Sequence, residues 1–322
     1  SFGGSGSILF NGKTFDQFTL LNNEWIIDNQ YSNSYDYSEY NGALFAEVSK
    51  KWKKIGFRAG IRGEYTKLKG FSNSLNQQFM DSSYVLPFPS LSILLEPNEN
   101  VGITFFYNSG IDRPQFSNFD PFVRIQDSLS INYGNPYLLP AFEHNFGVDL
   151  NLFYAYNLSL TYKHIDRPIN QLSFIEEGSF IRETTPWNAD KEQGLEASLG
   201  LPFELNWLSG WNSIWVDYSK YSFTSEFNRE SLYYLTYGAY SYLTFTLPKD
   251  WMITNRFHVN KWGGAEGVSN ARANWGIRVT KKYMGNNLQF FLDVGNIIPP
   301  RNKFNEISGN FVYNIDSQRR FT

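Results

Sequence analysis

Long segments in which apolar and polar side chains alternate are the feature that most constrains how this chain can fold. In "KIGFRAGIRGEYTKL" (54–68), one parity holds the apolar residues Ile55, Phe57, Ala59, Ile61 and Tyr65, and the other holds Arg58, Arg62, Glu64 and Thr66. Successive side chains of a β-strand point to opposite faces, so this spacing predicts a strand with one apolar and one polar face.

The same alternation recurs along the chain, clearly at 100–111, 142–154 and 271–280, and again at 193–203, 233–247 and 288–295. Only Phe106 interrupts it within 100–111. Most of these segments reach the roughly 9 to 11 residues that a tilted strand needs to cross a bilayer. A strand of a soluble protein is typically only about 5 to 6 residues long. Length therefore favours membrane-crossing strands over half-buried strands of a soluble sheet.

The aromatic content supports this interpretation, because 18% of the residues are Phe, Trp or Tyr. Aromatic residues favour strands, and in membrane barrels they form girdles at both interfaces. Girdle positions are predicted for Tyr233, Tyr237, Trp251, Trp275 and Tyr283, which lie near the ends of expected strands. The alternative is that the aromatic side chains pack the core of a soluble β protein.

Composition excludes several other classes. No window approaches 18 consecutive apolar residues, which argues against membrane-spanning helices. The mean hydropathy of -0.40 agrees with a barrel, whose lumen and loops are polar. A net charge of -3 offers no basic surface for nucleic acid, and the absence of cysteine removes disulfides and thiolate metal sites.

The connections between expected strands alternate between short and long. Short polar turns are predicted near 49–54, 96–100, 154–157, 203–211, 248–251 and 282–287, and longer loops at 69–84, 112–141, 221–231, 260–270 and 298–317. A barrel with one periplasmic and one extracellular rim produces this alternation. "IEEGSF" (175–180) is an exception, predicted as a tight hairpin of two strands that protrude beyond the membrane.

Counting gives about 14 strands. One or two are expected before residue 35, followed by 39–52, 54–68, 86–96, 100–111, 142–154, 157–176, 179–203, 211–222, 231–247, 250–260, 270–283, 287–298 and a last strand from about 317. The start, "SFGGSGSILF", lacks the features of a secretion signal, and "SQRRFT" stops where the last strand should begin. We therefore expect residues 1–322 to be one part of a larger barrel.

The stretch 110–150 resembles TonB-dependent receptors, especially the outer-membrane β-barrel relatives common in Bacteroidota. In that family an Arg-Pro or Ala-Pro step ends an upgoing strand, and a Gly-Asn-Pro-x-Leu-x-Pro-Glu signature opens the next. The matching residues are Arg113, Pro114, Pro121, Phe122, Gly134, Asn135, Pro136, Leu138 and Pro140. The Glu of the signature is missing, because Ala141 and Phe142 follow Pro140. The segments 59–70 and 291–298 also resemble family motifs, although the prolines could simply stiffen a surface loop.

The resemblance implies an all-β fold, a transmembrane antiparallel up-and-down β-barrel of about 22 strands with an N-terminal plug. The plug and the final strand would then be missing from this chain. It also implies location in the bacterial outer membrane, contact with lipid, and a TonB complex reached through the plug. The implied function is import of a large or scarce solute, such as an iron chelate, cobalamin, a glycan or a peptide. Some relatives are subunits of larger surface complexes, so a surface lipoprotein is a further possible partner.

The polar parity identifies the inner face, since an Arg at the midplane of the lipid face costs roughly 2 to 4 kcal/mol. Inward positions are predicted for Arg58, Arg62, Glu64, Glu143, Asp149, Lys163, Glu196, Asp217, Arg256, Arg272 and Arg278. Both signs are mixed, which favours scaffolding ion pairs over a substrate site. In the functional alternative, a ligand contacts the outer loop through Arg113, Phe116, Phe119, Tyr133, Asn135 and Tyr137, and the lumen through Arg58, Arg62, Arg272 and Arg278.

Enzymatic chemistry has little support, and no cofactor or metal is expected. The three histidines, His144, His164 and His258, are scattered over separate strands, and no nucleophile elbow, phosphate loop or His-Glu-x-x-His pair occurs. Two alternatives to the transporter stay open. One is a stand-alone porin-like or structural barrel, and the other is a soluble β-sandwich that binds a ligand.

Overall fold

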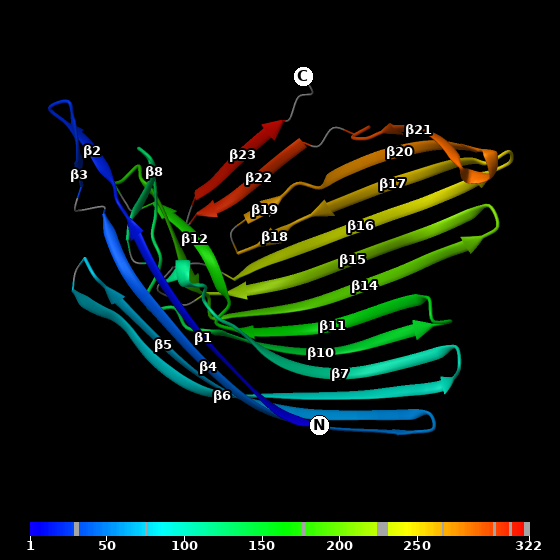
Figure 1. Ribbon diagram of the computed structural model, residues 1–322, viewed down its shortest axis with the longest axis horizontal. Coiled ribbons are helices and arrows are strands. Elements are labelled where there is room, and N and C mark those ends of the chain that lie inside the picture. The colour runs from blue at the N-terminus through cyan, green and yellow to red at the C-terminus, as the bar shows by residue number, and fades with distance from the viewer. Residues whose placement is uncertain are drawn as a thin grey trace.

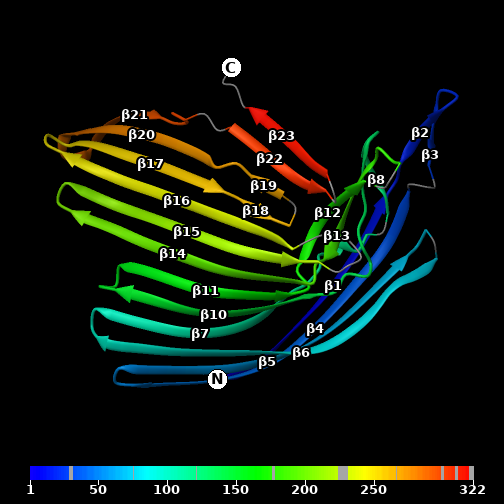
Figure 2. The ribbon, with the colours of Figure 1, turned by 180° about the vertical axis from the view of Figure 1, so that it is seen from behind.

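A continuous antiparallel sheet of 13 strands dominates the computed structural model (Figures 1 and 2). The structure describes residues 1–28, 32–74, 76–120, 122–175, 178–223, 231–265 and 267–298, and the backbone of 301–308 and 311–318. In sheet order the strands are β1 (Phe2–Phe15), β4 (Asn33–Trp52), β5 (Ile55–Ser72), β6 (Gln77–Asn98), β7 (Val101–Asp112), β10 (Ala141–Leu152), β11 (Tyr156–Asp166), β14 (Lys191–Leu205), β15 (Leu208–Ser222), β16 (Leu232–Leu247), β17 (Trp251–Lys261), β20 (Arg272–Tyr283) and β21 (Leu288–Val294). Each strand pairs with its neighbours in chain order, and β1 and β21 are the edges.

All six predicted short turns are confirmed. Connections of two to four residues join the paired strands β4 and β5, β6 and β7, β10 and β11, β14 and β15, β16 and β17, and β20 and β21. A short 3-10 turn, η3 (Met284–Asn286), makes the last of these connections, where Gly285 takes a φ of +61°. Tight turns of this kind fix the register of each hairpin.

The predicted loop at 69–84 is wrong. β5 runs to Ser72 and β6 begins at Gln77, so these residues extend the two strands and leave only a tight connection. Polar side chains occupy outward positions in this part of the two strands. Lys69 is the register partner of Asp81, and Lys67, just before the segment, is the register partner of Ser83. Outward side chains need to be apolar only within the hydrocarbon layer. The alternation of apolar and polar residues therefore ends where the strands leave that layer.

The predicted strands 157–176 and 179–203 are each broken in two. Arg167 adopts a φ of +56° before Pro168, which separates β11 from β12 (Ile169–Ile175). On the return, Ala189 and Asp190 separate β13 (Arg182–Asn188) from β14. The protruding hairpin is thus β12–β13, a sheet separate from the wall, although Glu176 and Glu177 of its turn lie outside the described residues.

Smaller sheets complete the fold. β12 and β13 continue into β9 (Ser130–Asn132) and β8 (Arg124–Asp127), with β13 and β9 parallel. β18 (Gly263–Gly264) and β19 (Gly267–Ser269) pair with β22 (Arg301–Ser308) and β23 (Phe311–Gln318), and β2 (Phe18–Leu21) pairs with β3 (Glu24–Ile27). Residues 317 and 318 belong to β23, and the rest of the strand expected from about 317 lies outside the described residues, as do Pro121 and 224–230.

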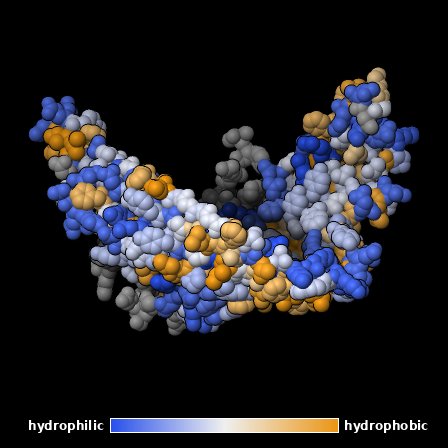
Figure 3. Space-filling view, turned by 60° about the horizontal axis from the view of Figure 1, so that its bottom comes forward, coloured by the Kyte–Doolittle hydropathy of each residue, from blue (hydrophilic) through white to orange (hydrophobic). Residues whose placement is uncertain are grey.

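The two faces of the wall differ as the parity predicts. Exposed apolar side chains share the outward parity on successive strands, for example Ile61, Phe105, Phe146, Leu160 and Ile214. The wall is curved, and the smaller sheet of β8, β9, β12 and β13 lies within its hollow (Figures 1 and 2). Apolar residues gather on the forward lower part of the wall (Figure 3). The apolar sides thus face outward, and no second sheet among the described residues covers them.

Phe106, which breaks the alternation, points inward for a local reason. Its register partner on β10 is Gly147, and a Cβ at Gly147 would lie 2.3 Å from the Phe106 ring. The ring therefore covers the backbone of the neighbouring glycine. Trp215 lies over Gly238 in the same way. Aromatic rings placed over strand glycines restore packing that the glycine lacks.

Helices contribute little, since the described elements besides strands are the three-residue turns η1 (Phe116–Asn118) and η3. Within the described residues, no helix has the length and apolar content needed to span a membrane.

Candidate functional site

The segment 113–140, which connects β7 to β10, folds onto the concave face of β4, β5 and β6. We call it the covering segment; its residue 121 lies outside the description. Phe119 is only 1% exposed and belongs to a buried cluster with Tyr37, Leu68, Met80 and Leu138. Burial of one such side chain contributes roughly 1.5 to 3 kcal/mol. The segment is therefore held on the wall by a small apolar core of its own.

Stacked rings extend this core toward the strand ends. The rings of Tyr35 and Phe116 stack at a centroid distance of 4.9 Å, and those of Tyr37 and Phe119 at 5.9 Å. Such pairs add about 0.5 to 1.5 kcal/mol beyond the area they bury. Packing alone accounts for the aromatic character of Phe116 and Phe119, two residues for which the sequence predicts ligand contact.

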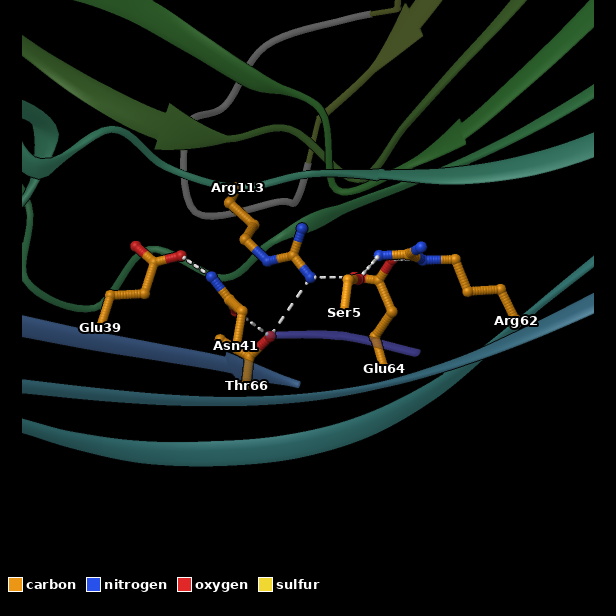
Figure 4. A network of polar contacts seen from close by, with 7 residues as sticks. All are labelled: Ser5, Glu39, Asn41, Arg62, Glu64, Thr66 and Arg113. Carbon is orange, nitrogen blue, oxygen red and sulfur yellow. Dashed lines mark hydrogen bonds and ion pairs between the residues drawn. The ribbon is translucent and has the colours of Figure 1, made fainter. Parts of the chain in front are cut away.

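A polar network adjoins this core through Tyr37, and Figure 4 shows the network's other residues. Arg113, at the start of the covering segment, forms an ion pair with the carboxylate of Glu64 on β5 and donates to Thr66 Oγ1 at 3.2 Å. Arg62 Nε contacts the other carboxylate oxygen of Glu64 at 2.5 Å. Charge-assisted hydrogen bonds of this type are about twice as strong as neutral ones. Two residues predicted as ligand contacts, Arg62 and Arg113, thus meet at a single wall carboxylate.

The network continues across β4. Thr66 donates to Asn41 Oδ1 at 2.8 Å, Asn41 donates to Glu39 at 2.5 Å, and Tyr37 donates its hydroxyl proton to Glu39 at 2.8 Å. Burial, together with the Glu39 carboxylate, holds the pKa of Tyr37 above its usual range. The Tyr37 hydroxyl therefore stays protonated and remains a donor.

The Gly-Asn-Pro step of the covering segment has a structural explanation. The Gly134 N–H donates to Asp120 O and the Asn135 N–H to Asn118 O, both at 2.6 Å. A Cβ at Gly134 would lie 2.5 Å from both the Asn118 and the Asp120 carbonyl oxygens, so only glycine permits this approach. Asn135 also accepts from Tyr137 N at 2.9 Å through its side chain. Asn135, a predicted ligand contact, thus shapes the turn.

Beside this turn lies a cavity of about 310 Å³ between the covering segment and the sheet of β8, β9, β12 and β13. Its lining includes Asn118, Arg124, Asn132, Tyr133, Gln171 and Thr184. Tyr133 donates to Glu183 at 3.0 Å, and the Asn132 Oδ1 atom is buried without a hydrogen-bond partner among the described residues. Tyr137, by contrast, is 86% exposed at the surface.

The remaining inner charges are mostly paired within the wall. Lys163 contacts Glu192 at 2.7 Å and Asp217 at 3.6 Å. Near the β21 edge of the wall, Asp293 on β21 forms ion pairs with Arg256 on β17 and Arg278 on β20, the latter at 2.5 Å. These contacts agree with the scaffolding interpretation.

Two predicted lumen residues stand apart. Arg58 is largely exposed and lies 3.9 Å from Glu47, and the buried Nε of Arg272 has no hydrogen-bond partner among the described residues. The structure thus joins Arg62 with Arg113 and places Tyr133 and Asn135 near one cavity. It leaves Arg58, Arg272 and Arg278 at separate places on the wall.

Sequence reasoning missed Tyr35, Tyr37, Glu39 and Asn41, which complete the network and its core. The alternation on β4 could have predicted that these side chains face inward, since all four occupy odd positions, on the same face as Ala43. Two of the three histidines lie side by side: His144 and His164 are register partners with ring centroids 6.4 Å apart. The described residues contain no cluster of three or more His, Cys, Asp or Glu placed to hold a metal ion.

A curved antiparallel wall that is apolar outside and polar inside, with its long connections at one end, defines the wall of a transmembrane β-barrel. The chain matches the model of the "Outer membrane protein beta-barrel family" over residues 1–322, and it belongs to that family. The protein is accordingly located in the bacterial outer membrane. No match was found among curated proteins.

Among solved structures, the FrpB iron transporter from Neisseria meningitidis (F3-3 variant) is similar with a TM-score of 0.51 and 14% identity, covering 90% of this chain and 42% of that chain. The siderophore receptor PirA from Pseudomonas aeruginosa gives 0.42 and 13%, with 92% and 62% covered. The outer membrane transporter YddB from Escherichia coli gives 0.43 and 11%, with 84% and 52% covered. The chain thus spans about half the length of these structures, and at these identities the similarity concerns the fold alone.

Proposed function

We propose that the full-length protein is a TonB-dependent outer-membrane receptor of the Bacteroidota type that imports a large or scarce solute. Iron chelates, cobalamin, glycans and peptides are the candidate classes. The observation that carries the proposal is the covering segment, an ordered loop anchored on the inner wall at Glu64 by Arg113. A receptor needs binding groups held in fixed positions by a rigid scaffold, and this arrangement provides them at the outer end of the lumen.

We assign ligand contact to the exposed Tyr137 and to the cavity lined by Arg124 and Tyr133. Clefts of about 300 to 1,000 Å³ with a few convergent polar groups are typical ligand sites. Phe116, Phe119 and Asn135 serve in this proposal as the support for that surface. Arg58, Arg272 and Arg278 are secondary contacts along the inner wall. A plug and its TonB complex stay predictions, as does a surface lipoprotein partner.

Uptake measurements test the proposal. Cells that express the full-length protein receive one labelled solute at a time, an iron chelate, cobalamin, an oligosaccharide or a peptide, with and without a functional TonB complex. The proposal expects saturable uptake of one class that disappears without TonB. Steady single-channel conductance of the purified protein together with TonB-independent uptake would instead support the porin-like alternative.

A pair of variants locates the ligand surface once the solute is known. Tyr137→Ala is expected to weaken binding about tenfold, which corresponds to about 1.4 kcal/mol. Tyr154→Ala is the matched control, because Tyr154 is equally exposed, at 86%, but lies in a short turn at the other rim. Equal effects of the two variants would refute the assigned surface and leave the transport proposal standing.

A further inference from the structure

Three hydrogen-bonding side chains lie together on the outward face of β15, β16 and β17. Asn212 is the register partner of Ser241. Asn255 is the register partner of Leu243, the next residue after Ser241 on the same face of β16. All three share the parity of the exposed apolar residues Ile214 and Leu247, so they point away from the lumen. We call Asn212, Ser241 and Asn255 the polar patch.

The polar patch lies within the hydrocarbon layer rather than at its edge. Asn212 is four residues from Leu208, where β15 begins, and six from the exposed Tyr218. At about 3.4 Å per residue, Asn212 is about 14 Å along the strand from Leu208, which is about 10 Å in height for a strand tilted by about 40°, within an apolar belt about 25 Å tall. The outward positions of β5, β6 and β14 at these depths hold only apolar, glycine or proline residues. The patch therefore departs from the rule that these three strands follow at the same depth.

Part of the patch is satisfied internally. The indole N–H of Trp275 donates to Asn255 Oδ1 at 2.8 Å, and Asn255 Nδ2 lies 3.5 Å from Ser241 Oγ. The side chain of Asn212, in contrast, has no hydrogen bond to any residue that the structure describes. Lipid tails offer neither donors nor acceptors, so an amide at this depth is stabilised only by another polar group.

We propose that the polar patch is an interface within the membrane, and that its partner is a second copy of this protein. A carboxamide carries two N–H donors and one acceptor, so two Asn212 side chains related by a two-fold axis satisfy each other with a pair of N–H···O bonds. The patch has no charged side chain, so a partner needs no opposite charge. Gly210, Ala239 and Ser241 are small neighbours that let two walls approach closely.

Cross-linking tests the interface, because the chain has no cysteine and a single introduced thiol reports one position. The full-length protein carrying Ile214→Cys, beside the patch, is compared in lipid vesicles at low protein density with Ile61→Cys on β5. These side chains are 53% and 55% exposed, so they form a matched pair. A short bifunctional thiol reagent is expected to give dimers of Ile214→Cys at least ten times faster than of Ile61→Cys.

Adding Asn212→Leu to Ile214→Cys is expected to slow the dimerisation at least tenfold. Leucine suits a lipid-facing position, and circular dichroism checks that this variant is folded. Equal cross-linking at both cysteines, or a rate unchanged by Asn212→Leu, overturns the proposal. Reaction of Ile214→Cys with a different protein in native outer membranes, without self-linking, overturns the choice of partner.

Discussion

An arginine–carboxylate–arginine cluster occurs twice on the inner face, and the two clusters have different surroundings. Arg62 and Arg113 flank Glu64, whose side chain is 15% exposed, and Arg256 and Arg278 flank Asp293, whose side chain is 26% exposed. Arg113 belongs to the covering segment, whereas all members of the second cluster belong to the wall strands β17, β20 and β21.

Position, rather than chemistry, decides what such a cluster does. At Glu64 the ion pair ties a loop to the wall and lies beside a buried aromatic core. At Asp293 it links neighbouring strands that are already paired by backbone hydrogen bonds. Exposed ion pairs contribute little stability, so the second cluster is expected to matter far less than the first.

The largest effect is expected from removing the core of the covering segment. Phe119→Ala should destabilise the docked segment by about 3 to 5 kcal/mol, because it empties a fully buried site. Hydrogen exchange of the amides of Asn118 and Gly134 measures this change. Tyr137→Ala in the same segment is the control, since its exposed side chain should contribute less than about 0.5 kcal/mol. Equal protection in both variants would contradict the assigned core.

A smaller effect is expected at the tight approach of the Gly-Asn-Pro turn. Gly134→Ala should cost about 2 to 3 kcal/mol, because the new methyl group meets backbone carbonyl oxygens that cannot move aside. The matched control is Gly110→Ala on β7, where a Cβ would have open space. Limited proteolysis should show faster cleavage within 113–140 only for Gly134→Ala, and identical cleavage of the two variants would refute this account of the motif.

Removing the wall anchor is expected to have a still smaller effect. Glu64→Gln should weaken docking of the covering segment by about 1 to 2 kcal/mol, because Arg113 loses its carboxylate while Arg62 can turn to water. Exchange rates of the amides in 113–140 should rise about tenfold. Unchanged rates would mean that the aromatic core holds the segment without help from the ion pair.

The smallest effect is expected from the second cluster. Asp293→Asn should leave exchange and proteolysis of the covering segment unchanged, since no contact joins Asp293 to that segment within the described residues. Only the amides of β20 and β21 should respond. A loss of protection in 113–140 comparable to that of Glu64→Gln would remove the distinction between the two clusters.

The sequence predicted the wall well, because lipid requires an apolar side chain at almost every outward position within the hydrocarbon layer. Leu158 and Leu160 on β11, for example, follow this rule throughout the membrane-crossing part of the strand. The rule fails where strands extend beyond the layer, so the outer parts of β5 and β6 were predicted as a loop. The alternation of apolar and polar residues also does not reveal a break in the backbone such as the one at Arg167.

The candidate site could be predicted only in part. Arg62 and Arg113 were expected to face the lumen or its mouth, but their meeting at Glu64 was not predicted. Glu64 and Arg113 are 49 positions apart in the sequence, with β6 between them. Alternation gives the face of each residue and not its depth or its neighbours two strands away. The motif resemblances pointed to the two segments 59–70 and 110–150, and the structure brings Glu64, Thr66 and Arg113 from these segments together.

One parity of the wall faces lipid and the other faces an aqueous interior, and adjacent positions on β11 distinguish the two faces. Fluorophores attached to Leu160→Cys and Thr161→Cys in vesicles are exposed to brominated lipid and to a water-soluble quencher. This assignment of the two faces predicts quenching by brominated lipid at the first position and by the water-soluble quencher at the second. Equal quenching by lipid at both positions, or the reversed pattern, would contradict it.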